Sequence, residues 1–341
     1  MKTFIIPKHY DASKADQVYK IDYQNLAIDA MAYKATNAIS DAATDKFKIA
    51  LMPIDVQNTF CIPGFELFVG GAPEDNKRLA EFIYANMGRI TKIFPTMDTH
   101  KAMQIFHPIF FLDTNGNHIS TSIMITSNDL ITGKYSINPG VAASLGVSYT
   151  VLKKHSIHYA QSLEKKNKDQ LMVWPYHAML GGIGHALVAI IEEAIFFHTM
   201  ARNSESGTEI KGGNPLTENY SVLSPEVLDT FDGSAIAHRN ANFIQKLLDY
   251  DMLIIAGQAK SHCVAWSIED LLTDIMAKDP SLAKKVYLME DCTSPVIIPG
   301  VIDFTDQANA AFERFRAAGM HLVKSTDPID QWPDVDVNKF V

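Results

Sequence analysis

Cysteine is scarce in this chain, which has only Cys61, Cys263 and Cys292, all far apart in the sequence. Three distant cysteines do not make the disulfide framework of a small secreted domain, so a reducing setting is favoured. The first ten residues lack the apolar core of a secretory leader, and no apolar run is long enough to span a bilayer. We therefore expect a cytoplasmic protein without a membrane partner.

Positive charge is also in short supply. Lys and Arg together number 30 against 39 Asp and Glu, which gives a net charge of −9. Because no Lys/Arg-rich run offers a phosphate-binding surface, we expect no nucleic-acid partner. The 341 residues are 47% hydrophobic. That is ample for a buried core, in either two domains or one enlarged α/β domain.

Short apolar runs alternate with amphipathic stretches along the chain. The apolar runs, each followed by small or polar residues, predict buried parallel strands at 48–55, 90–96, 252–257, 286–290 and 321–324. The amphipathic stretches predict helices at 73–87, 237–249, 265–277 and 304–318. This alternation favours a mostly parallel sheet, which binds ligands outside the carboxyl ends of its strands.

Two parts do not follow the alternation: a partly helical N-terminal extension at 1–45 and an insertion in the main domain. The main domain is expected at 46–330, followed by a C-terminal tail at 331–341. The main domain carries an insertion at about 108–171, in which Asn115-Gly116 between two apolar runs predicts a hairpin. The insertion is either a surface decoration or a lid or oligomer contact, and a homo-oligomer is possible.

Two candidate groups follow the first two predicted strands. Asp55 ends the first strand, although an Asp in that place is more often a cap or turn former. Asp98 and His100, at i and i+2 after the second strand, point to the same side and can share one metal ion. Such a pair is common by chance and needs a third ligand.

Cys263 lies between the predicted strand at 252–257 and the helix that starts near 265. Unpaired N–H groups and the helix dipole at such a turn lower the pKa of a thiol and can hold an oxyanion. A buried apolar cysteine is the alternative. Cys61 and Cys292 have no such setting and are expected to be structural.

Five segments, in this order, resemble motifs of the nicotinamidase/isochorismatase family of cysteine hydrolases. They are Asp55-Val56-Gln57-Asn58-Thr59-Phe60, Asp98-Thr99-His100, Trp174-Pro175-Tyr176-His177, Lys211-Gly212 with Asn219-Tyr220-Ser221, and Gly257-Gln258-Ala259-Lys260-Ser261-His262-Cys263-Val264. One such motif is modestly specific, whereas five in the right order are strongly so.

The resemblance implies a three-layer α/β/α fold and a catalytic set of Asp55, Lys211 and Cys263. Cys263 would attack an amide carbonyl to form a thioester, and Asp55 would pass the thiol proton to the leaving ammonia. Lys211 would stabilise the charged groups. The N–H groups of Ala259 and Cys263 would form the oxyanion hole, with a cis peptide bond before Ala259.

The resemblance also implies one divalent ion, expected to be Zn²⁺, with Mn²⁺ or Fe²⁺ as alternatives, held by Asp98, His100 and His177. The ion would orient a small-molecule amide through a ring nitrogen. Phe60, Trp174 and Tyr220 match positions that pack on a flat substrate, although they are also plausible core aromatics. His107 is a further candidate for the ion or the substrate.

Several residues depart from the family pattern. Thr59 replaces the second Asp of the opening motif, Ala178 a frequent Cys, and Thr99 and Lys101 a Trp and a Pro. None of these changes removes a catalytic group. Hydrolysis of a small aromatic amide is therefore the leading hypothesis. One alternative is a different substrate, either a carbamoyl, ureido or hydroxamate compound or an isochorismate-like ether. A second is a non-catalytic relative, which would be expected to have lost Asp55, Lys211 or Cys263.

Overall fold

The computed structural model describes residues 4–165, 170–298, 300, 302–336 and 338. Five parallel strands form its central sheet in the order β13-β10-β9-β1-β2. They are β1 (Ile49–Ile54), β2 (Lys92–Ile93), β9 (Met252–Gly257), β10 (Val286–Met289) and β13 (His321–Val323). The five predicted strands are thus confirmed as one parallel sheet.

The middle of the sheet is buried along its whole length. Every residue of β1 and β9 is buried, and the two strands pair from Ile49 with Met252 to Ile54 with Gly257. Near-continuous apolar sequence is what a strand covered on both faces requires. Because both strands end at the same level, Asp55 and the segment after Gly257 emerge side by side.

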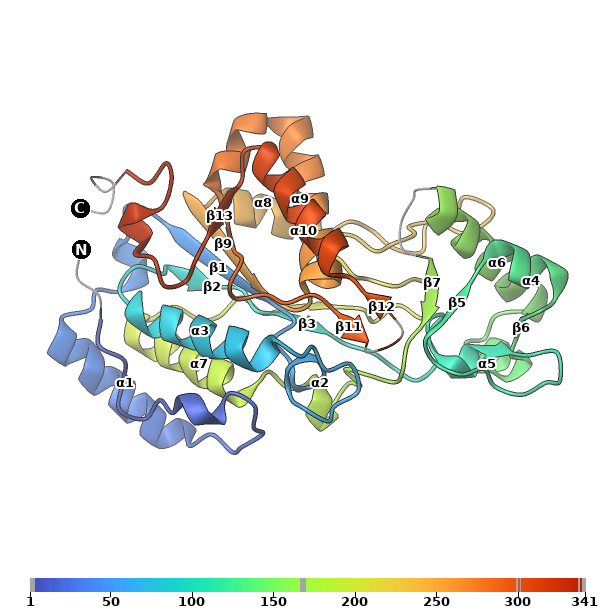
Figure 1. The fold of residues 1–341 in the computed structure, drawn as a ribbon, viewed down its shortest axis with the longest axis horizontal. Coiled ribbons are helices and arrows are strands. Elements are labelled where there is room, and N and C mark those ends of the chain that lie inside the picture. The colour runs from blue at the N-terminus through green and yellow to red at the C-terminus, as the bar shows by residue number, and fades with distance from the viewer. Residues whose placement is uncertain (1–3, 166–169, 299, 301, 337, 339–341) are drawn as a thin grey trace.

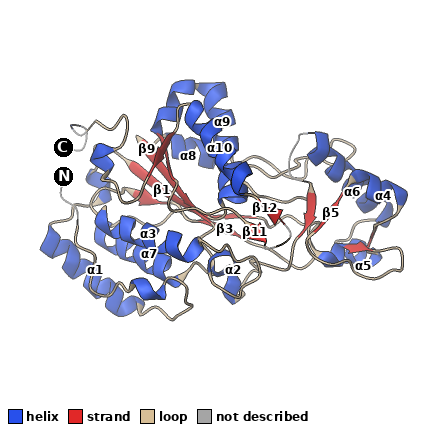
Figure 2. Cartoon of the chain, viewed as in Figure 1, coloured by secondary structure: helices blue, strands red, loops and turns tan. Residues whose placement is uncertain are grey.

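Helices cover both faces of this sheet (Figures 1 and 2). One layer contains α3 (Ala72–Ala85) and α7 (Ala189–Arg202), and the other contains α8 (Ala241–Leu248), α9 (Ala265–Lys278) and α10 (Thr305–Ala317). Two apolar clusters fill the spaces between sheet and helices. The three-layer α/β/α fold is confirmed, together with all four predicted helices.

The helix α7 was not predicted, and its surroundings explain why. It packs against α3 on one side and against α1 (Tyr23–Asn37), from the N-terminal extension, on the other. A helix buried on several sides lacks the apolar and polar alternation by which amphipathic helices are detected. At its end the Nη2 group of the buried Arg202 donates to both carboxylate oxygens of Asp45, at 2.5 and 2.6 Å, which ties the extension to the domain.

The second predicted strand is divided in two. β2 pairs with β1, but after Pro95 the chain continues as β3 (Thr96–Asp98), which pairs with β8 (Glu209–Lys211). In this parallel pair Asp98 lies opposite Lys211. The short β8 had not been predicted, although it brings Lys211 to the carboxyl end of the sheet.

The insertion forms a lobe of its own beside the sheet, green in Figure 1. Its apolar cluster is separate from the two clusters of the main domain. It contains β4 (Phe111–Leu112), β5 (Ile123–Ile125), β6 (Ser136–Ile137), β7 (Leu171–Val173), α4 (Ser127–Thr132), α5 (Pro139–Ser144) and α6 (Tyr149–Lys165). Residues 166–169 of the predicted insertion lie outside the described residues.

The hairpin predicted at Asn115-Gly116 is only partly correct. A turn is present, since Gly116 N–H donates to Asp113 O at 3.1 Å, but the flanking runs share a single bridge, Leu112 with His118. The strands pair elsewhere, β4 with β6 and β5 with β7. These longer-range pairs bury Phe111, Ile125 and Val173 in the core of the lobe, and that burial outweighs the local turn signal.

Three further small elements lie outside the layers described above. α2 (Asn58–Cys61) follows β1, and an antiparallel pair, β11 (Ile297–Ile298) with β12 (Ile302–Asp303), lies between β10 and α10. At the start of the predicted tail, Trp332 stacks on Phe82 with a centroid distance of 5.7 Å. Among the described residues, no helix is both long and apolar enough to cross a membrane.

Candidate active site

Asp55, Lys211 and Cys263 meet at the carboxyl end of the sheet. Lys211 Nζ lies 3.0 Å from Asp55 Oδ2 and 3.7 Å from Cys263 Sγ, and it also donates to the carbonyl of Asn219 at 2.8 Å. All three side chains are buried. The structure thus brings together three groups from distant parts of the sequence, as the predicted catalytic set requires.

The backbone around Asp55 fixes its carboxylate. Asp55 has a left-handed φ of 47°, and the Thr96 hydroxyl donates to its Oδ1 at 2.6 Å. Gly257, opposite the end of β1, has a φ of 112°, and a Cβ there would lie 2.1 Å from Ile54 O. Only glycine permits this close approach of the two strand ends.

Cys263 sits in a short π-helical turn, Lys260–Val264, that runs directly into α9. The predicted strand-to-helix turn is therefore confirmed. The peptide bond between Gln258 and Ala259 is cis, as the resemblance implied. Gln258 N–H donates to Ile54 O and Lys260 N–H to Ser294 O, which holds the backbone on both sides of Ala259.

The charges in this cluster depend on one another. Burial alone would lower the pKa of Lys211, but Asp55, Asp98 and Cys263 raise that pKa well above its usual value. Burial raises the pKa of Asp55, which the ammonium of Lys211 opposes. One buried cation therefore balances two buried carboxylates, since Lys211 Nζ also lies 3.0 Å from Asp98 Oδ1.

The prediction that the turn lowers the pKa of the nucleophile is wrong for the protein at rest. Burial raises the pKa of Cys263 well above its usual value, and Lys211 opposes this only in part. Desolvation of the thiolate outweighs the attraction of the nearby cation. The resting group is then a thiol.

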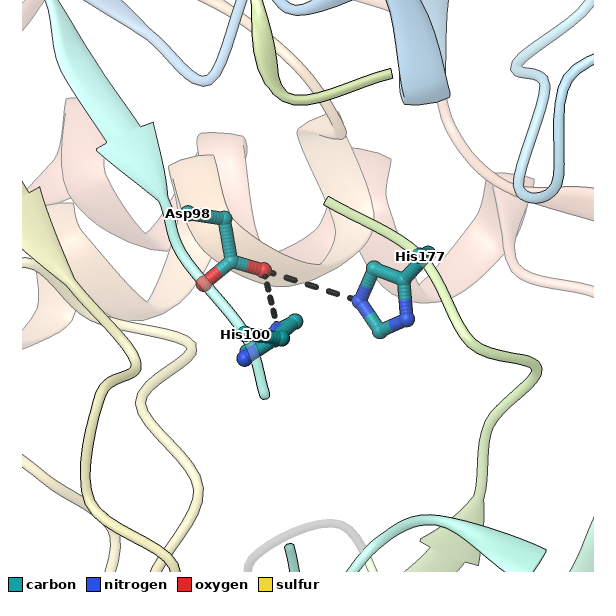
Figure 3. Close-up of side chains that lie close together, drawn as sticks. All are labelled: Asp98, His100 and His177. Carbon is teal, nitrogen blue, oxygen red and sulfur yellow. Dashed lines mark hydrogen bonds and ion pairs between the residues drawn. The ribbon is translucent and has the colours of Figure 1, made fainter. Parts of the chain in front are cut away.

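Asp98, His100 and His177 form a second cluster beside the first (Figure 3). One candidate ligand atom from each residue lies within 4.8 Å of the others, and all three residues are buried. Asp98 Oδ2 is 2.8 Å from His100 Nε2 and 3.6 Å from His177 Nε2. The carboxylate of Asp98 thus contacts Lys211 through Oδ1 and the two histidines through Oδ2.

The hydrogen bonds of the two histidines direct them toward Asp98, which raises the pKa of His100 against the effect of burial. His177 Nδ1–H donates to Pro175 O at 2.8 Å and His100 Nδ1–H to Gly212 O at 3.2 Å, so both Nε2 atoms face Asp98. Burial and the neighbouring His100 lower the pKa of His177, so its Nε2 presents a lone pair. A lone pair and a carboxylate oxygen repel each other in a buried site unless a cation lies between them.

The side chain of Gln57 and the backbone of Gly212 hold this cluster in place. Gln57 Oε1 accepts from Asp98 N–H and its Nε2 donates to Asp98 O, both at 2.8 Å. Gly212 has a φ of 87°, and a Cβ there would lie 2.6 Å from Asp98 Oδ1. The metal-ligand candidates are therefore held by groups that tolerate little displacement.

For two other polar residues, the structure differs from what the sequence predicted. His107 stays outside the three-residue set, 5.8 Å from His100 between ring centroids, and burial lowers its pKa to about 3. Glu218 was missed. It is buried, and burial raises its pKa to about 7, a shift that the nearby His100 opposes. Its position seven residues after Lys211 was the available signal, but an isolated Glu is usually a surface residue.

A cavity of about 450 Å³ connects the two clusters. Asp98 and His177 from the histidine cluster line it, and so do Ala259 and Cys263 from the nucleophile turn. The three predicted substrate-binding aromatics, Phe60, Trp174 and Tyr220, also line it. Trp174 Nε1–H donates to the Tyr220 hydroxyl at 2.9 Å, and the Phe60 ring lies edge-on to His177 at 5.7 Å.

Comparison with solved structures identifies the architecture. The yeast nicotinamidase bound to the inhibitor nicotinaldehyde matches with a TM-score of 0.51 at 18% identity, over 81% of this chain and 99% of that chain. A second structure of the yeast nicotinamidase gives a TM-score of 0.50 at 18% identity and the same coverage. The fold is that of the nicotinamidases.

A nicotinamidase from Acinetobacter baumanii is also similar, with a TM-score of 0.49 and 17% identity over 82% of this chain and 97% of that one. No protein-family model and no curated protein sequence matches the chain. The predicted resemblance is confirmed at the level of the fold, and the chemistry has to rest on this chain's own side chains.

Proposed function

We propose that this protein is a metal-assisted cysteine amidohydrolase that converts a small aromatic or heteroaromatic amide to its acid and ammonia. The observation that carries this proposal is the contact of Lys211 with both Asp55, at 3.0 Å, and Cys263, at 3.7 Å, because Cys263 lines a cavity. A nucleophile that faces a bound small molecule would thus have a base and a cation directly beside it.

The proposed reaction follows from the charges at rest. Asp55 takes the thiol proton as Cys263 Sγ attacks the amide carbon, and the oxyanion forms against the N–H groups of Ala259 and Cys263. Asp55 then gives the proton to the leaving nitrogen, the C–N bond breaks, and ammonia leaves a thioester on Cys263. Water attacks the thioester, again with Asp55 as base, and releases the acid and the thiol. Lys211 offsets the negative charge in each step.

Asp98, His100 and His177 are proposed to hold one divalent cation, with Zn²⁺ the leading choice. Three protein ligands leave open positions, as in functional rather than structural zinc sites. Such a cation, when bound, supplies a Lewis acid that can hold a ring nitrogen of the substrate and so orient its amide toward Cys263. Phe60, Trp174 and Tyr220 are proposed to pack on the ring.

The charge of the cavity favours an amide over an isochorismate-like ether. Three carboxylates, Glu66, Asp98 and Glu218, are among its described lining residues, and these include no Lys or Arg. The proposed divalent cation can pair with one carboxylate group of such an ether, but the described lining residues offer no Lys or Arg for the second. Neutral and cationic amides carry no such penalty.

A panel of small amides, assayed for ammonia release, tests the proposal. It should include pyridine-3-carboxamide, benzamide, a carbamoyl and a ureido compound, each with and without chelator. We expect turnover of the aromatic amides by the wild-type protein and by a Cys292→Ala control, and none by Cys263→Ala. Release at equal rates from wild type and Cys263→Ala would contradict the proposal.

A further inference from the structure

The cavity beside Cys263 has two parts that differ in exposure. The inner part is lined by Phe60, Trp174 and Cys263, whose exposed fractions are 7%, 6% and 7%. The outer part is lined by apolar side chains that are only partly buried, Phe65, Leu67, Phe68 and Ile298, and by Ile297, which is 49% exposed. One continuous cavity therefore runs from the reactive centre to an apolar mouth.

The cavity is also larger than the proposed reaction centre needs. A volume of about 450 Å³ lies within the range that encloses drug-sized ligands, whereas a single-ring carboxamide is much smaller. A ring placed between Phe60, Trp174 and Tyr220 would fill the inner part alone. The outer side chains would then remain exposed to water.

Two separate segments build the apolar mouth. The loop 65–69 is fixed to α2 because Leu67 N–H donates to Thr59 O at 3.2 Å and Val69 N–H to Phe60 O at 2.8 Å. In the second segment, Val296 N–H donates at 3.1 Å to the hydroxyl of Ser261, within the turn that carries Cys263, and β11 follows directly. One segment is thus anchored to the helix that carries Phe60 and the other to the turn that carries Cys263, as a preformed binding surface should be.

We propose that the substrate is an aromatic amide with an apolar extension on its ring, and that the extension packs on Phe68, Ile297 and Ile298. This inference rests on the proposed function and names the substrate class of that site. Burying the exposed apolar mouth against the extension stabilises the complex. The extension ends at a polar rim, where the exposed Glu66 disfavours a carboxylate. The inserted lobe adds Thr121 and Ser122 to the same rim.

The experiment compares five substrates: pyridine-3-carboxamide, its two butyl derivatives with the chain on the 5- or 6-position, and the two matching carboxypropyl derivatives. We expect the better butyl isomer to exceed the parent in kcat/KM by about tenfold, since a few methylenes become partly buried. The carboxypropyl derivative of equal length should fall below the butyl one.

Two variants test whether the preference for the butyl derivative arises from the apolar mouth of the cavity. Ile297→Ser should lower the butyl-to-parent ratio of kcat/KM about threefold or more. Ile131→Ser, at a residue that is 55% exposed on α4 and does not line the cavity, should leave the ratio unchanged.

If the parent amide is hydrolysed but neither butyl isomer is preferred, or if the ratio is the same in Ile297→Ser, the inference is overturned while the proposed function stands. If none of the amides is hydrolysed, the proposed function fails and the inference with it.

Discussion

The two clusters at the carboxyl end of the sheet each contain a buried aspartate, but the charge of that aspartate is balanced differently in each. In the nucleophile cluster, the negative charge of Asp55 is met by the protein's own cation, Lys211, at 3.0 Å. In the histidine cluster, Lys211 reaches only Oδ1 of Asp98, and Oδ2 faces the Nε2 atoms of His100 and His177. The first cluster is complete with protein groups, whereas the second has the arrangement of a cation site.

This difference suggests a division of work. The nucleophile cluster contains the groups for attack and proton transfer, so it should carry the chemistry. The histidine cluster has no nucleophile, so it should serve to orient the substrate. Lys211 joins the two, because its single ammonium lies between Asp55 and Asp98. Changes on either side of Lys211 should therefore have distinguishable consequences.

The largest effect is expected at the nucleophile. Cys263→Ala should lower kcat by on the order of 10⁴-fold or more, because no other group in the cluster can form the thioester. Cys61→Ala serves as the matched control, since burial raises the pKa of that thiol to about 12 and it does not line the cavity. Steady-state kinetics and melting temperatures of both variants check this, and a substantial loss of activity in Cys61→Ala alone would reverse the assignment.

The next effect tests the link between the clusters. Lys211→Met should lower kcat by about 10²- to 10³-fold, as expected when one stabilising charge is removed from a buried reaction centre. It should also lower the melting temperature, because two buried carboxylates lose their partner. Lys211→Arg keeps the charge and should recover most of the stability. Equal melting temperatures for wild type and Lys211→Met would show that the ion pairs are absent in solution.

A smaller effect is expected at Glu218, on the side of the histidine cluster. Glu218→Gln removes a buried carboxyl group that interacts with His100 and Asp98. Metal affinity should fall by about tenfold, as is typical for groups that support metal ligands, with kcat at saturating metal little changed. Competition with a zinc-binding dye measures the affinity. A fall in kcat with unaltered metal affinity would move Glu218 to the nucleophile cluster.

The smallest effect concerns the stability of the fold in acid, which has to be known before a loss of activity at low pH can be assigned to either cluster. His198 is buried on α7, and burial lowers its pKa from 6.5 to about 4, which its hydrogen bond to Ile90 O opposes. Between pH 6.5 and about 4, His198 is therefore protonated in the unfolded chain and neutral in the folded protein. The neutral side chain supports the fold fully above pH 6.5, and this support, on the order of 3 kcal/mol, is lost as the pH falls toward 4.

Melting temperatures measured from pH 7 to 4 check this prediction. His198→Gln should show a weaker dependence on pH over that window than the wild type. An unchanged slope in the variant would show that other groups cause the acid destabilisation. Activity lost at a pH where the melting temperature is still high would then be assigned to the two clusters.

Much of this arrangement could be predicted from the sequence, because its signals are local. Apolar runs such as 252–257 require no partner to be recognised as buried strands, and the turn before α9 identified Cys263. The order of five motifs then linked residues that are distant along the chain. The candidate ligands Asp98, His100 and His177 do lie together, as that order implied.

The features that were missed depend on contacts between distant segments. β8 has only three residues, and it is a strand because β3 leaves the main sheet to pair with it. The pairing partners of β4 and β5 depend on which residues fill the core of the inserted lobe. The pKa of Cys263 depends on burial, which a turn motif does not reveal. Glu218 gains its unusual pKa in the same way.

The division of work is tested most directly by kcat/KM for pyridine-3-carboxamide and for benzamide, measured with metal-loaded and metal-stripped protein. Elemental analysis should find one divalent ion per chain in the loaded sample, and none after stripping or in His177→Ala. The loaded protein should prefer the pyridine amide, since benzamide has the same shape but no ring nitrogen. Stripping should remove this preference and leave the slower hydrolysis of benzamide in place. A preference that persists without metal, or hydrolysis of both amides lost in equal measure, would contradict the account.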